Sequence, residues 1–132
     1  MRTILVAAAL RDREGHDAAV ALLLAKSKPG VRVVPGLNPP PEGIDWESVR
    51  AAEGGWDGAY EWAARAHDGI CAVPVDGDAG ISRGVYAMVN GALALGKPVL
   101  ICRRGALARV AAVRVVNKDE YKGVYGICVE AV

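Results

Sequence analysis

Four acidic side chains stand where they could do chemistry on a bound ligand. Asp57 and Glu61 lie one helical turn apart, and Asp76 and Asp78 follow directly on a buried apolar run. A pair of carboxylates can share general acid and base work, or one can attack an electrophilic carbon as a nucleophile. Each such residue is more often a solvated surface group, so all four are candidate catalytic residues only.

The segment VPVDGDAGISRGVYAM, residues 73–88, has the composition of an anion-binding turn. An apolar run ends in a glycine-rich turn, after which Ser82 opens a predicted helix. The first N–H groups of a helix lack intrahelical partners and attract negative charge. The alternative is that the glycines only form a turn and Ser82 only caps the helix. The candidate ligand-binding residues of this segment are Gly80, Ser82, Arg83, Gly84, Tyr86 and Met88.

Arg11 follows the first apolar run and can clamp a phosphate or stack on a base, unless it simply lies in an exposed charged loop. Neither His16 nor His67 has a partner at metal-ligand spacing, and the three cysteines are isolated. We therefore expect no metal and no cofactor. Free cysteines inside apolar runs are typical of buried thiols in a reducing compartment.

Apolar runs alternate with helical segments along the chain. Unbroken apolar strands are buried on both faces, which is typical of parallel α/β sheets. We predict a single domain, 1–132, with a flavodoxin-like or Rossmann-like three-layer sandwich and a mostly parallel sheet of five or six strands. The expected strands are 3–9, 31–35, 69–75, 99–102, 110–116 and 124–130. The expected helices are 15–27, 45–68 with a break at the Gly54-Gly55 pair, and 82–95.

In such sheets ligands bind outside the carboxyl ends of the strands. Arg11 should lie there after the first strand, and Ser82 after the third.

The composition of the chain excludes some classes of partner. Sixteen basic and fifteen acidic residues nearly cancel, so nothing resembles a nucleic-acid-binding stripe. No apolar stretch is long enough for a membrane span or has the form of a signal peptide, so we expect a cytoplasmic protein.

At these residues the chain resembles the nucleoside 2-deoxyribosyltransferase family, and more closely its branch of 2′-deoxynucleoside 5′-phosphate N-hydrolases. The resemblance rests on Leu10-Arg11, on Trp62 followed by residues 68–73, on residues 82–86 and on residues 92–100, and it covers most of 3–103. It implies cleavage of an N-glycosidic bond, with a nucleoside or nucleotide as substrate. It also implies a homo-oligomer, a dimer or larger.

The resemblance assigns roles to particular positions. Ser82 matches the serine that helps to hold the 5′-phosphate, and Arg11 matches an arginine after the first strand. The nucleophilic glutamate of the family falls on Met88, whose thioether cannot form a glycosyl ester. The family's second acidic residue falls between Asp57 and Glu61.

Three hypotheses remain. The chain is an enzyme acting on a glycosidic bond, with one of the four carboxylates replacing the missing glutamate. Alternatively, it is a nucleotide-binding module, a sensor or subunit, without catalysis. The third is a purely structural, oligomer-forming protein, which leaves the turn before Ser82 unexplained.

Overall fold

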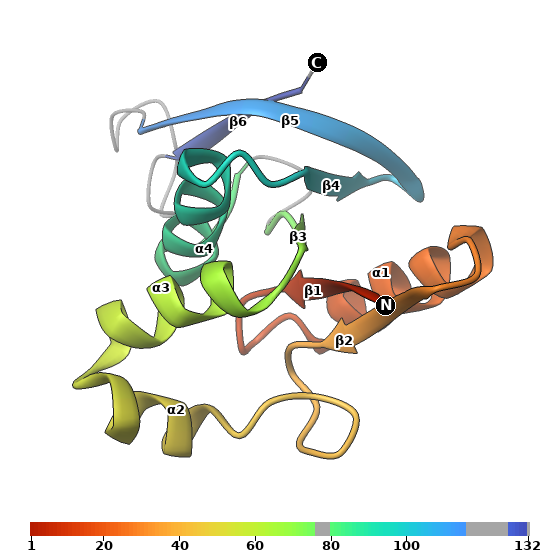
Figure 1. Cartoon of the computed structure of the whole chain (residues 1–132). Coiled ribbons are helices and arrows are strands. Elements are labelled where there is room, and N and C mark those ends of the chain that lie inside the picture. Colours follow the sequence, from red (N-terminus) through yellow and green to blue (C-terminus); the bar gives the residue numbers. More distant parts are fainter. Residues whose placement is uncertain (76–79, 116–126, 132) are drawn as a thin grey trace.

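The computed structural model describes residues 1–75, 80–115 and 127–131, with side chains described as far as residue 112 (Figure 1). Strands and helices alternate through most of the chain. The strands are β1 (Arg2–Ala7), β2 (Val31–Pro35), β3 (Gly69–Ala72), β4 (Val99–Arg103), β5 (Ala106–Val115) and β6 (Ile127–Ala131). The helices are α1 (Arg13–Lys26), α2 (Trp46–Glu53), α3 (Trp56–Ala66) and α4 (Arg83–Ala94). No described helix is long and apolar enough to cross a membrane.

The strands form a mostly parallel sheet with the order β2-β1-β3-β4-β5-β6, so the expected α/β class is confirmed. β1 pairs in parallel with both β2 and β3, and β3 pairs in parallel with β4. β5 and β6 then add antiparallel pairings. The fifth strand was expected to begin at residue 110 but begins at Ala106. It begins earlier because Arg104 and Gly105, both at positive φ, form a tight turn that folds β5 back on β4.

Local chemistry explains where the helices begin and end. Asp12, Asp45 and Ser82 are N-caps whose side chains accept a hydrogen bond from a backbone N–H in the first turn. The predicted break at the glycine pair is confirmed, since Gly54 adopts the left-handed conformation with φ of 77° and ends α2. β3 ends at Ala72, shorter than expected, although the residues up to Val75 remain buried.

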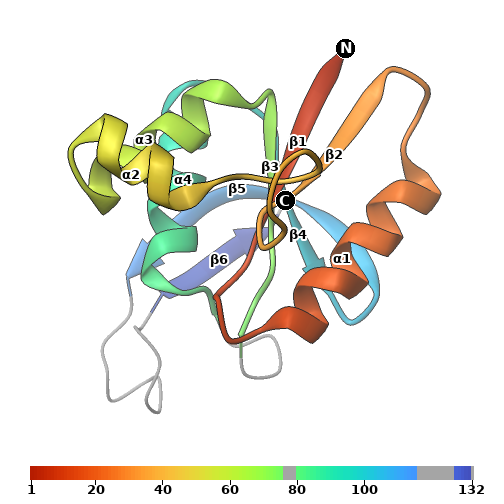
Figure 2. The ribbon, with the colours of Figure 1, turned by 90° about the horizontal axis from the view of Figure 1, so that it is seen from below.

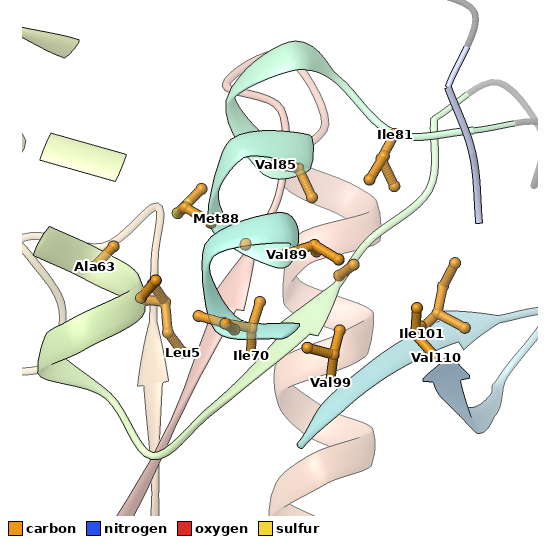
Figure 3. Close-up of a cluster of buried hydrophobic side chains, with 14 of the residues drawn as sticks. Leu5, Ala63, Ile70, Ile81, Val85, Met88, Val89, Val99, Ile101 and Val110 are labelled. Atoms are coloured by element: carbon orange, nitrogen blue, oxygen red, sulfur yellow. The ribbon is translucent and has the colours of Figure 1, made fainter. Parts of the chain in front are cut away.

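The two faces of the sheet carry separate apolar cores, because side chains alternate along a strand. Leu5 and Ile70 face the core formed with α3 and α4, which Figure 3 shows in close-up. Val6 and Cys71, their neighbours in sequence, face the core formed with α1. Helices therefore cover opposite faces of the central strands.

This arrangement places the topological switch point of the sheet between β1 and β3. The chain leaves β1 for α1 on one face and leaves the neighbouring β3 for α4 on the other. Connections that diverge in this way open a crevice at the carboxyl ends of the strands. In Figure 2 the start of α1 and the β4–β5 turn lie at this same, lower edge, whereas the N-terminus lies at the opposite edge.

Candidate ligand site at the carboxyl edge of the sheet

The start of α4 lies at this edge, directly after β3. The Ser82 hydroxyl accepts a hydrogen bond from the Val85 N–H at 3.4 Å, and the Ser82 carbonyl accepts one from the Tyr86 N–H at 2.8 Å. Ser82 is half-buried and does cap the helix. A capping hydroxyl used as an acceptor still has its own proton to donate to a ligand. Gly80 is held by the Val75 N–H, which donates to its carbonyl at 2.7 Å.

Two arginines lie at the same edge of the sheet as this helix start. Arg11 lies in the turn between β1 and α1 and is exposed, and Arg83 is the exposed first residue of α4. Both therefore belong to the carboxyl edge, as expected. Asp76 and Asp78, the other candidates near this turn, lie outside the described residues.

Gly84 serves helix packing, which differs from the expectation that it lets a ligand approach the backbone. A Cβ added there would meet Cζ and the hydroxyl oxygen of Tyr60, each at 2.9 Å. The Tyr60 ring therefore occupies the space that the glycine leaves open. One face of α4 approaches α3 closely again at Gly91, where a Cβ would lie 3.0 Å from the Cβ of Ala64.

Gly84→Ala is accordingly expected to lower the free energy of unfolding by about 1–3 kcal/mol, because Tyr60 must leave its position. Urea unfolding monitored by tryptophan fluorescence measures this. The matched control is the double variant Tyr60→Leu/Gly84→Ala, in which the smaller side chain removes the clash and the two effects should not add. Full additivity of the two substitutions would contradict the packing role.

Tyr60 also connects the candidate carboxylates to α4. Its pKa is raised above the ordinary value, first by burial and then by the charge of Asp57, while Arg83 acts in the opposite direction. Asp57, Tyr60 and Arg83 thus share one neighbourhood at the start of α4. Glu61, one turn further along α3, is exposed.

Met88 lies in the apolar core. It is 5% exposed and packs in the cluster formed by α3, α4 and the sheet, and Figure 3 shows it extending from α4 toward Ala63. Tyr86 is half-buried against the same core. The position of the family's nucleophile is therefore filled by a packing side chain.

Sequence analysis missed the residues that hold the loop after β2. Arg13 donates from Nη2 to the carbonyl of Leu37 at 3.0 Å and from Nη1 to Oδ1 of Asn38. His16, fully buried, accepts from the Leu37 N–H on Nε2 at 3.1 Å and contacts Asp17 through Nδ1 at 2.8 Å. The pKa of Asp17 is lowered, chiefly by this histidine. Nothing in the sequence pairs residues 13–17 with 37–38, because their proximity depends on β1 pairing with β2.

Aromatic side chains of α2 and α3 pack against one another. Trp46 donates from its indole nitrogen to the carbonyl of Gly36 at 2.7 Å and meets Tyr60 and Trp62 edge-on, each at 6.4 Å between ring centroids. Trp56 stacks on Tyr60 at 5.9 Å. These polar and aromatic groups thus come from four separate segments of the chain, namely α1, the loop after β2, α2 and α3.

The remaining reactive groups are inert or dispersed. Burial, with a smaller contribution from Cys102, raises the pKa of the Cys71 thiol to about 12, so Cys71 is a protonated core side chain. No cluster of His, Cys, Asp and Glu able to hold a metal ion occurs in the part of the chain that the structure describes.

No protein-family model matches the chain, and neither a curated protein nor a solved structure was found to match it.

Proposed function

We propose that the chain is a single three-layer domain that binds a nucleoside monophosphate at the carboxyl edge of its sheet. The observation that carries this proposal is the start of α4, where the half-buried Ser82 and the first helical N–H groups follow β3 at the carboxyl edge of the sheet. Arg11 and Arg83 add positive charge at the same edge. Phosphate groups are recognised by such combinations of backbone N–H groups, a hydroxyl and a guanidinium.

Binding without the family's chemistry is the function that the site supports best. Met88 is a core residue, and nothing in the described part of α4 supplies a carboxylate in its place. The nucleoside portion of the proposed ligand is inferred from the family resemblance. Tyr60 and Trp46 provide aromatic surface for it near the helix start. Aromatic faces stack on bases with little regard to base identity.

A second candidate function, hydrolysis of the N-glycosidic bond, is favoured by one observation. The carboxylate of Asp57 lies close enough to Tyr60 to raise the pKa of that phenol, and Arg83 acts on the same group. Asp57 could therefore take the nucleophile's role from α3. Asp57→Asn would abolish the release of free base if this function holds, and leave binding intact.

Isothermal titration calorimetry with the common ribo- and deoxyribonucleoside monophosphates, each compared with its nucleoside, tests the binding proposal. The monophosphate is expected to bind at least about tenfold more tightly than the nucleoside, and Arg83→Gln to remove most of that difference. Ser82→Gly should act in the same direction, since glycine retains capping ability but lacks the hydroxyl.

Arg109→Gln, at an exposed position on β5, is the matched control and should bind as the unsubstituted chain does. Equal affinity for nucleoside and monophosphate, or no effect of Arg83→Gln, would overturn the proposal. Chromatography of the same incubations for free base decides between binding alone and hydrolysis.

A further inference from the structure

A hollow lies away from the start of α4. It has a volume of about 400 Å³ and is bounded by the first half of β1, by β2, by the loop that enters α2, by α2 and by the last turns of α3. Thr3, near the amino end of β1, belongs to its wall, so it lies toward the edge of the sheet opposite to Ser82. In Figure 1 this region lies between β2, α2 and α3. Its volume falls within the range of small-molecule sites.

His67 contributes a hydrogen-bond acceptor to this hollow. The side chain is only 7% exposed, and its Nδ1 lies 2.8 Å from the carbonyl oxygen of Ala63. A carbonyl can only accept, so Nδ1 carries the proton and Nε2 carries the lone pair. Within the described residues no protein group bonds Nε2. Because His67 lines the hollow and its Nδ1 edge is engaged by α3, Nε2 is the ring atom left for a ligand.

The imidazole is kept neutral by its surroundings. Burial is the largest cause that lowers the pKa of His67, and the charges of Lys97 and Arg32 lower it further. The carbonyl of Ala63 and the charge of Asp68 act in the opposite direction. The effect of Arg32 also indicates that its guanidinium lies within electrostatic range of the imidazole.

Opposite charges line the hollow without neutralising each other. Arg32 donates from Nη2 to the carbonyl of Pro41 at 3.1 Å, which leaves most of its donors for other partners. Asp45 accepts from the N–H and the hydroxyl of Ser48 at 3.2 and 2.7 Å, and these bonds lower its pKa, so the carboxylate is ionised. In the described structure Arg32 and Asp45 form no ion pair with each other, although both line the hollow.

We propose that this hollow binds a free α-amino acid with an apolar side chain. The ligand carboxylate pairs with Arg32, and its ammonium group donates to Asp45 and to Nε2 of His67. Trp62 and Val49 supply the apolar wall for its side chain. An ammonium group has three donors and no acceptor, which matches a wall with two acceptors better than a hydroxyl does. The site shares none of these residues with the proposed nucleotide site and does not depend on it.

Titration calorimetry with three probes tests the chemical class. L-Leucine carries both charged groups, 4-methylpentanoate lacks the ammonium, and 3-methylbutylamine lacks the carboxylate. L-Leucine is expected to bind with a Kd of about 1 mM or below, and each analogue at least about tenfold more weakly. No binding of L-leucine at about 20 mM, or equal affinity for either analogue, would overturn the proposal.

Two variants locate the site on the protein. Arg32→Gln alters an exposed side chain, so the variant is expected to keep the fold. It should weaken the binding of L-leucine at least about tenfold. His67→Phe keeps the ring volume and removes the acceptor, with a similar loss expected. Arg109→Gln is again the control. Unchanged affinity for L-leucine in a folded Arg32→Gln variant would overturn the assignment, and titration of a nucleoside monophosphate into the same variants separates this result from any failure at the carboxyl edge.

Discussion

Replacing Met88 with glutamate is expected to lower the free energy of unfolding by about 3–5 kcal/mol at neutral pH, because it places a carboxylate in the apolar core without a partner. Met88 is 5% exposed and packs in the cluster beneath α4. A glutamate in the family's active site is effective only where substrate and solvent reach it. The buried cluster that contains Met88 includes Ala63, Val85 and Val89, none of which can solvate a charge.

The pH dependence of this variant follows from the same burial. Desolvation raises the folded-state pKa of the new carboxyl above its unfolded value of about 4.3. The penalty is therefore largest at neutral pH, shrinks as the pH falls toward the unfolded pKa, and vanishes below that pKa, where the group is protonated in both states. Urea unfolding of Met88→Glu and of the unsubstituted chain at pH values of about 7 and 4.5 measures how this loss of stability changes with pH.

Met88→Leu is the matched control and should cost less than about 1.5 kcal/mol, since it nearly conserves volume. A Met88→Glu variant with unchanged stability and new release of free base would show that the family's pocket is present beside Met88. That result would contradict the packing role assigned here.

Replacing Lys97 with methionine is expected to lower the free energy of unfolding by about 2–3 kcal/mol, because it removes charged hydrogen bonds at a helix end. Lys97 Nζ donates to the carbonyls of Ala64, Arg65 and His67, each at 2.8 Å. These carbonyls end α3, where the helix lacks N–H partners and carries partial negative charge. Lys97 therefore caps α3 from the segment that enters β4.

Methionine retains most of the apolar stem of Lys97, so the change in stability of the variant reports the contribution of the ammonium group. Lys28→Met, at an exposed position in the turn before β2, is the control and should change the stability by less than about 0.5 kcal/mol. Thermal and urea unfolding of both variants provide the comparison. A loss at position 97 no larger than at position 28 would show that the three hydrogen bonds contribute nothing net.

The hydrogen bonds of Lys97 also bear on the resemblance to the deoxyribosyltransferase family. The Gly-Lys-Pro entry to β4 is one of its motifs, yet in this structure the lysine has a structural role remote from the carboxyl edge. Gly96, at φ of 70°, lets the chain turn from α4 into β4. Part of the shared pattern thus reflects the requirements of a parallel α/β sheet.

Elements with local signals could be predicted from the amino-acid sequence. Apolar runs marked the strands, Asp45 and Ser82 marked helix starts, and the glycine pair marked the break between α2 and α3. These signals can be read from the sequence because a cap or a breaker acts on its own neighbours within a few residues. The alternation of strands and helices also placed Arg11 and Ser82 at one edge.

The contacts of each candidate side chain, in contrast, became visible only in the packed fold. Gly84 faces Tyr60, Met88 faces Ala63, and His67 faces a hollow shared with Arg32, and in every case the partners are more than twenty residues apart in sequence. Such contacts depend on how α3 packs against α4 and how β2 pairs with β1. The free energy of a buried side chain is set by these distant neighbours, so its role as packing or ligand group follows from the packed fold rather than from local pattern.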